Sequence, residues 1–112
     1  MPNLSAQLDD VFLALGDSTR RAVLEQLSAG PTPVSKLARR FDMALPSFMQ
    51  HLRVLEDRGL VQSRKQGRVR TYELTPQPLK VAERWMVDQR HLWERRLDQL
   101  DTFLNQLKKT QP

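Results

Sequence analysis

Four basic side chains surround one glycine in the segment 61–74: Arg64, Lys65, Arg68 and Arg70 lie around Gly67. Cations on such a short ribbon bind phosphate groups, because the ribbon can follow the backbone of a nucleic acid. A long arginine at the tip of the ribbon also fits a narrow minor groove. The spacing therefore predicts a phosphate-binding hairpin.

A helix expected over residues 45–58 precedes this hairpin and has two unlike faces. Its apolar stripe, at about 100° per residue, consists of Leu45, Phe48, Leu52 and Leu55. Gln50 faces the other way and can pair with adenine through its amide, whereas Arg53 can reach guanine or a phosphate. Ser47 flanks that face and fits a base or a phosphate, although an ordinary solvated face is the alternative for Gln50 and Ser47. His51 lies at the stripe boundary and suits phosphate contact or packing equally.

The positive charge of the chain is concentrated in the same region. Residues 34–73 hold nine Lys and Arg against four Asp and Glu, a net +5, whereas the rest of the chain holds nine of each. This concentration favours a polyanion as partner. Arg39 and Arg40 are expected either to contact the DNA backbone or to be merely solvated. Arg20 and Arg21 stand at an expected helix start, where cations oppose the helix dipole, so a tertiary partner is expected for them.

Composition excludes several classes of site. The 112 residues support one domain, and the absence of cysteine excludes disulfides and thiolate metal ligands. There is no recognisable signal peptide, and no apolar run approaches the roughly 20 residues of a membrane helix. There is no catalytic triad, phosphate loop or paired acid–base motif. We therefore expect a soluble cytoplasmic protein that is not an enzyme and has no cofactor, metal or membrane partner.

Apolar spacing and helix caps predict the elements that position these side chains. The first helix, over residues 4–15, has an apolar face of Leu4, Leu8, Val11, Phe12 and Leu15. Asp17 or Ser18 caps the second helix, which ends before Gly30. Its buried stripe is expected to be Val23, Leu24 and Leu27.

A helix-turn-helix is expected over residues 33–58. Thr32 caps a short helix that has Pro33 at its first position. Its inward residues are expected to be Val34, Leu37, Ala38 and Phe41. After a turn, the helix over 45–58 follows and stops at Gly59.

The segment 60–74 is expected to form two strands of a hairpin. If Gln66 and Gly67 make a two-residue turn, the opposite pairs are Val61 with Tyr72 and Lys65 with Arg68. The first pair anchors the ribbon to the core. The second pair opposes like charges, which is unfavourable unless phosphate or solvent relieves it.

The last helix begins at Pro76 and runs to about Lys108, roughly 50 Å at 1.5 Å per residue. Its heptad positions are Leu79, Met86, Trp93, Leu97, Leu100, Leu104 and Leu107. A small domain cannot bury so long a stripe, so the helix is expected to pair with its copy in a second subunit. A hairpin with the helix of residues 4–15 is the alternative. Glu83 and Arg90 interrupt the early heptads, which favours a mixed helical interface.

A known family resembles this pattern. Residues 15–24, L-G-D-S-T-R-R-A-V-L, are similar to the L-x-D-x-T-R-R-x-x-L signature of ArsR/SmtB-type winged-helix repressors. The similarity covers roughly residues 8–79 and continues through Leu37-Ala38, Pro46, residues 51–61 (H-L-R-V-L-E-D-R-G-L-V), Gly67-Arg68 and residues 72–74.

The resemblance implies a homodimeric bacterial transcription factor, usually a repressor. The helix from Leu45 would be its recognition helix and the hairpin 60–74 its wing. Terminal helices form the dimer interface of that family, in agreement with the heptads. The expected interface residues are Leu4, Leu8, Leu79, Met86, Trp93, Leu97, Leu100 and Leu104.

Two departures from the family affect the expected site. The family often has a capping serine where this chain has Ala44, and Asp42 is the expected substitute. Met49 stands where the family often has a serine or threonine that contacts DNA. The expected contacts therefore shift to Ser47, Gln50 and His51.

The metal-sensing branches carry cysteines near the helix-turn-helix, which this chain lacks. A second metal site of the family uses Asp and His on the last helix, where Asp88, His91 and Glu94 share one face here. A lone histidine with arginines on both sides favours ion pairing over metal. The resemblance thus implies the non-metal branch, whose inducer is often unknown.

The sequence predicts a mainly α fold with a small β-hairpin. It would be a single winged helix-turn-helix domain over residues 1–112 with a long dimerisation helix at 76–108. The expected function is sequence-specific binding to double-stranded operator DNA by a homodimer, most simply a repressor that occludes a promoter. A winged-helix module for an acidic protein partner is the alternative, although such a module needs no basic hairpin.

Overall fold

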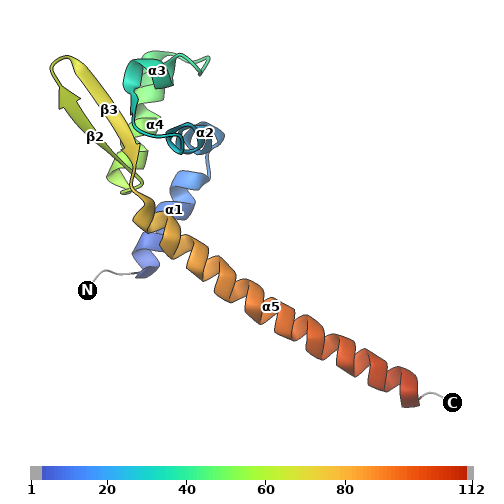
Figure 1. The fold of residues 1–112 in the computed structure, drawn as a ribbon. Helices are drawn as coiled ribbons and strands as arrows, with labels where there is room; N and C mark the ends of the chain where they lie inside the picture. Colours follow the sequence, from blue (N-terminus) through green and yellow to red (C-terminus); the bar gives the residue numbers. More distant parts are fainter. Residues whose placement is uncertain (1–3, 111–112) are drawn as a thin grey trace. The chain divides into compact units, whose positions relative to one another are not determined.

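The computed structural model describes residues 4–110, and the chain divides into two units, Met1–Ala82 and Glu83–Pro112, which we describe separately. The elements are α1 (Leu4–Leu15), α2 (Ser18–Leu27), β1 (Thr32–Pro33), α3 (Val34–Ala38), α4 (Leu45–Asp57), β2 (Val61–Gln66), β3 (Val69–Leu74) and α5 (Pro76–Thr110) (Figure 1). The predicted mainly helical fold with a small hairpin and a long last helix is confirmed.

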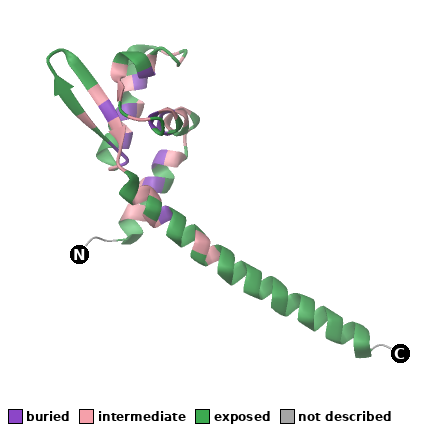
Figure 2. Cartoon of the chain, viewed as in Figure 1, coloured by how far each residue is buried: buried purple, intermediate pink, exposed green. Residues whose placement is uncertain are grey.

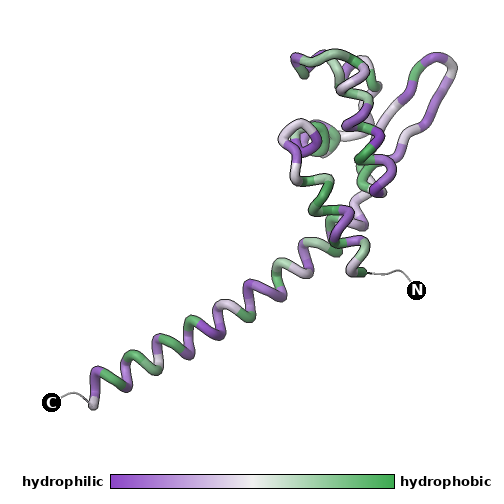
Figure 3. Tube along the Cα trace, turned by 180° about the vertical axis from the view of Figure 1, so that it is seen from behind, coloured by the Kyte–Doolittle hydropathy of each residue, from purple (hydrophilic) through white to green (hydrophobic). Residues whose placement is uncertain are grey.

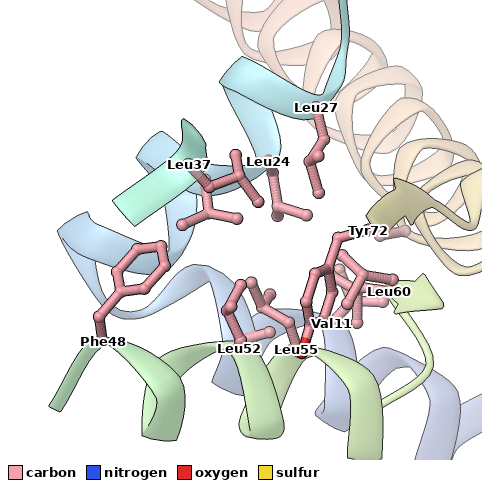
Figure 4. Close-up of a cluster of buried hydrophobic side chains, with 13 residues drawn as sticks. Val11, Leu24, Leu27, Leu37, Phe48, Leu52, Leu55, Leu60 and Tyr72 are labelled. Carbon is pink, nitrogen blue, oxygen red and sulfur yellow. The ribbon is translucent and has the colours of Figure 1, made fainter. Parts of the chain in front are cut away.

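The core of the first unit lies where α1 to α4 meet the sheet. Figure 4 shows its side chains pointing toward one another, among them Val11, Leu24, Leu27, Leu37, Phe48, Leu52, Leu55, Leu60 and Tyr72. Each helix contributes the residues spaced three or four apart along its apolar stripe. The predicted stripe of α2 is confirmed, because Val23, Leu24 and Leu27 are all buried.

One leucine departs from the expected stripe of α4. Leu45 is 58% exposed, whereas Leu52 on the same helix is 0% exposed, so the expectation that Leu45 is buried is wrong. Leu45 is the first residue of the helix, where no following turn of the core covers its side chain. The remaining predicted residues of the stripe, Phe48 and Leu55, are buried.

The ends of α2 and α4 have clear physical causes. Asp17 is the N-cap of α2, and its Oδ1 accepts the backbone N–H of Arg20 at 3.0 Å. Helix α4 ends in a Schellman motif, in which the N–H of Leu60 donates to the carbonyl of Leu55 and the N–H of Gly59 to that of Glu56. The motif requires a left-handed residue, and Gly59 has a φ of +82°.

The segment before α3 differs from the expectation. Thr32 and Pro33 form strand β1, and Pro33 occupies the N-cap position of α3 instead of its first helical position. Strand β1 pairs with β3, with Thr32 opposite Tyr72. This pairing satisfies extended backbone that the local sequence assigned to a helix cap, and the sheet gains a third strand in the order β1-β3-β2.

The register of the hairpin also differs. The two-residue loop is Gly67-Arg68, so Val61 lies opposite Leu74 and Lys65 lies opposite Arg70. The expected pairs, Val61 with Tyr72 and Lys65 with Arg68, are therefore wrong. Gly67 has a φ of +61°, which suits the first loop position of a II′ turn, whereas the expected turn would place Gln66 there.

The second unit is the part of α5 from Glu83 onward. Its apolar residues are exposed in this single chain, and Figure 2 shows almost the whole segment as exposed. Figure 3 shows hydrophobic and hydrophilic residues alternating along it. None of the helices formed by residues 4–110 is long and apolar enough to cross a membrane.

Candidate nucleic-acid interface

Helix α4 presents a polar face to solvent. Ser47, Gln50 and Arg53 are all exposed, and none of them makes a hydrogen bond or ion pair with another residue of the described chain 4–110. Pro46 stands in the first turn, where its missing N–H breaks no helical bond. The face is thus free to make contacts outside the molecule, near the helix start that reaches base edges in helix-turn-helix proteins.

The N-terminus of α4 lacks the cap that we expected. Ala44 holds the N-cap position without a side-chain hydrogen bond, and Asp42 makes no hydrogen bond within residues 4–110. The expectation that Asp42 substitutes for a capping serine is therefore wrong. Asp42 lies two residues ahead of the cap position, so its carboxylate does not occupy the place of an N-cap side chain.

His51 lies between α4 and the start of α2. Its ring Nδ1 is 3.5 Å from Nη1 of Arg20 and 3.6 Å from Oδ1 of Asp17, and 24% of the side chain is exposed. The backbone N–H of Arg20 lowers the pKa of the Asp17 carboxyl below its ordinary 3.8, with contributions from His51 and from the Arg20 charge. Asp17 is therefore ionised at neutral pH beside this histidine.

The two arginines at the start of α2 serve the end of α1. The Arg20 guanidinium donates through Nε to the carbonyl of Ala14 and through Nη2 to that of Leu13, both at 2.9 Å. Arg21 donates to the carbonyl of Leu15 at 2.6 Å. The last carbonyls of a helix lack internal partners and attract cations, so the predicted tertiary partner of these arginines is the C-terminus of α1.

The wing, residues 60–74, carries cations in two different settings. Arg64, Lys65 and Arg68 are exposed and make no hydrogen bond or ion pair in the described part of the chain. Arg70 instead donates to Ser63 Oγ at 2.8 Å, and that hydroxyl donates to Glu56 Oε2 at 2.6 Å. The charge of Arg70 is thus coupled to the recognition helix through Ser63.

A groove between α4 and β3 lies beside this chain of hydrogen bonds. Its lining residues are Met49, Arg53, Glu56, Arg70 and Tyr72. Tyr72 is 3% exposed, and its burial, together with the charge of Glu56, raises the pKa of its hydroxyl. The tyrosine therefore stays neutral and supports the wing from below.

Arg39 and Arg40 follow α3 and are exposed. Arg40 lines a hollow together with Lys36 and Glu25, away from the groove between α4 and β3. The structure brings Ser47, Gln50 and Arg53 onto one helix face. It places Arg39 and Arg40 on a separate element of the same unit.

Sequence reasoning missed Glu56 and Ser63 as partners of the wing. No local pattern joins them, because they meet only when β2 packs beside α4. The arginines at a helix start were a usable signal for the junction of Arg20 with His51, but the sequence did not identify the partner.

The predicted interface residues fall into two groups. Leu8 and Leu79 pack against the core of the first unit, whereas Leu4 is 58% exposed. The others, all exposed on the second unit, are Met86, Trp93, Leu97, Leu100 and Leu104. No group of three Asp, Glu or His side chains within residues 4–110 is placed to hold a metal ion. Glu94 pairs with Arg90 at 3.6 Å, which confirms ion pairing for this residue of the Asp88–His91–Glu94 face.

A helix-turn-helix followed by a basic two-stranded ribbon defines a winged helix-turn-helix protein. Residues 15–64 match the family model described as a helix-turn-helix domain. The chain is 52% identical to the solved structure of ArsR family transcriptional regulator RHA00566, with a TM-score of 0.77, over 84% of this chain and 97% of that one. The chain belongs to the ArsR family of winged helix-turn-helix transcriptional regulators.

Other relatives agree with this assignment. HTH-type transcriptional regulator Rv2034 of Mycobacterium tuberculosis is 44% identical over 68 residues, which are 61% of this chain and 64% of the relative. Transcriptional repressor SdpR of Bacillus subtilis is 28% identical over 72% of this chain and 90% of its own length. A structure of the homodimeric winged helix-turn-helix DNA-binding domain Mb0332 of Mycobacterium bovis is 27% identical, with a TM-score of 0.60, over 77% of this chain and 82% of that chain.

Proposed function

We propose that this protein is a homodimeric repressor that binds operator DNA in a sequence-specific manner. Helix α4 would enter the major groove, and the wing would contact the flanking phosphates. The observation that carries the proposal is the pairing, within one unit, of the exposed polar face of α4 with three wing cations that have no internal partner. The printed names of SdpR and Mb0332, a repressor and a DNA-binding domain, support it.

The proposed roles follow the geometry of each side chain. Gln50 would read a base edge, because it lies centrally on the exposed face of α4 and an amide matches adenine. Ser47 and Arg53 would contact a base or a phosphate on either side of it. The phosphate-binding residues would be Arg39, Arg40, Arg64, Lys65 and Arg68, with a smaller share for Arg70 and with His51 at the edge of α4.

The second unit would join two copies of the chain. Its exposed apolar residues recur at heptad spacing, and a second copy is the simplest surface that covers them. Mb0332 is named as homodimeric, which supports the same arrangement. A symmetric dimer would place two α4 helices on half-sites about one helical turn apart and so occlude a promoter.

The same proposal sets the cellular context. Because the partner is chromosomal DNA, the protein would act in the cytoplasm. We propose neither a catalytic activity nor a membrane partner, and the signal that relieves repression would bind elsewhere than at a thiolate site, since the chain has no cysteine.

The test is binding of the full chain to the DNA upstream of its own gene, measured over a salt series against a scrambled duplex. We expect a preference for the upstream DNA and a steep fall of affinity with salt. Equal affinity for both duplexes at moderate salt would refute the proposal and favour an acidic protein partner. Light scattering at micromolar concentration should give the mass of a dimer, and a monomer mass would refute the role of the second unit.

A further inference from the structure

The imidazole of His51 has two unlike neighbours at the same ring nitrogen. Nη1 of Arg20 lies 3.5 Å from Nδ1, and Oδ1 of Asp17 lies 3.6 Å from it. The guanidinium can only donate hydrogen bonds, and the ionised carboxylate can only accept them. In a neutral imidazole, Nδ1 therefore serves one neighbour or the other.

The distances and the existing bonds favour Arg20 as the partner. A separation of 3.6 Å is beyond hydrogen-bond range, and Oδ1 of Asp17 already accepts the backbone N–H of Arg20 at 3.0 Å. A proton on Nδ1 would also point toward the positive guanidinium. Nδ1 thus keeps its lone pair for Nη1, and in neutral imidazole the proton then resides on Nε2.

The guanidinium that selects this tautomer is itself held in place. Its Nε and Nη2 donate to the carbonyls of Ala14 and Leu13 at the end of α1. Only Nη1 remains for His51. Arg20 therefore meets the ring from a fixed position, as a second hydrogen-bond partner does when it sets the tautomer of a histidine.

The other ring nitrogen of His51 faces solvent. Nε2 makes no hydrogen bond within residues 4–110, and no side-chain nitrogen or oxygen there is both buried and unsatisfied, so Nε2 is accessible. His51 follows Ser47 by one helical turn, so the two side chains form one row along the flank of α4. A phosphate oxygen at this flank would meet an N–H donor and a hydroxyl.

We propose that Arg20 and Asp17 are positioning residues for His51, holding its Nδ1 so that Nε2–H is a fixed hydrogen-bond donor to a DNA phosphate beside Ser47. The donor would add affinity without reading sequence, because a phosphate oxygen is the same at every base pair. The phosphate contact rests on the proposed DNA binding. The tautomer itself does not.

The first experiment determines the tautomer in the free protein by ¹⁵N chemical shifts of the imidazole nitrogens. The chain has two histidines, and His91 is exposed on α5, so it serves as the internal reference. We expect neutral His51 to carry its proton on Nε2. In Arg20→Gln, checked for folding by its melting curve, the proton should move toward Nδ1 and Asp17. A proton on Nδ1 in the unaltered protein, or an unchanged tautomer in folded Arg20→Gln, would overturn the role of Arg20.

The second experiment compares two amides in place of the ring. Gln places its NH₂ where Nε2–H lies, whereas Asn places its NH₂ where Nδ1 lies. His51→Asn should weaken binding to the preferred DNA about five- to tenfold, the size of one lost hydrogen bond, and His51→Gln should restore most of that loss. Equal affinities of the two variants would overturn the proposed donor.

Binding to single-base variants of the DNA distinguishes a phosphate from a base. The loss in His51→Asn should be the same for every sequence, with an unchanged salt slope because the contact is neutral. A loss confined to one base pair would overturn the phosphate contact in favour of a base contact. If the unaltered chain binds no DNA while its tautomer is as expected, the proposed function fails and the positioning of His51 stands.

Discussion

The wing offers the most quantitative test of the proposed interface. Arg64, Lys65 and Arg68 are exposed and have no internal hydrogen bond or ion pair within residues 4–110, so their charges are available to phosphates. The triple change to glutamine keeps polar side chains of similar length and removes three charges. Because none of the three contributes to the core, the fold should be retained, with an unchanged melting temperature.

The magnitude follows from counterion release. Each lost phosphate contact reduces the slope of log affinity against log salt by about 0.9, so three lost contacts reduce it by roughly 2.7. Over a fourfold rise in salt, from about 50 to about 200 mM, the unaltered protein should therefore lose about 40 times more affinity than the triple variant. Fluorescence anisotropy with a labelled duplex measures both slopes.

Arg70 supplies a matched control on the same hairpin. Its guanidinium donates to Ser63, which in turn donates to Glu56, so part of its charge is already compensated inside the molecule. Arg70→Gln should reduce the salt slope less than Arg68→Gln does. Equal slopes for the unaltered protein and the triple variant, or a larger effect of Arg70, would refute this account of the wing.

Four further changes test other parts of the molecule. Gln50→Ala should relax sequence preference while leaving affinity for unrelated DNA unchanged, and a uniform loss over all duplexes would contradict base reading. Leu52→Ala should lower the free energy of unfolding by about 2–5 kcal/mol in urea titrations, whereas the exposed Leu45→Ala should cost less than about 0.5 kcal/mol, and similar costs would contradict the burial pattern. Asp17→Ala removes the cap of α2 and should cost about 1 kcal/mol at pH 7. Because the folded pKa of Asp17 lies below 3.8, its charge stabilises the fold above that pH, and this part should vanish as pH falls through the lowered value; a difference in stability that stays constant down to strongly acid pH would exclude it. Leu100→Glu should convert a dimer into a monomer in light scattering, and a persistent dimer would exclude this part of α5 from the interface.

Patterns local to each segment predicted most of the elements. Helix caps and glycine stops act within a few residues, so Asp17, Gly59 and the apolar spacing located α2 and α4 correctly. The family signature reached further, because its matched residues specify a whole winged helix. The prediction failed where one choice of turn shifts a register, as at Gly67, and where extended chain finds a partner strand, as at Thr32.

The site shows the same division. The outward position of Gln50 followed from helical periodicity alone. The tie from Arg70 through Ser63 to Glu56 did not, because it joins residues that meet only when the hairpin packs beside α4.

The sequence by itself determined which residues are charged, which helix faces are apolar and where the positive excess lies, since these depend on composition and on the repeat of the α-helix. Only the tertiary structure decided which cations keep their charge free for a ligand. The arginines of α2 serve the carbonyls of α1, and Arg20 also meets His51, whereas three arginines and lysines of the wing have no partner within residues 4–110. The reason is physical: a long cationic side chain pairs with whatever acceptor folding brings within reach, and that neighbour is set by packing between distant segments.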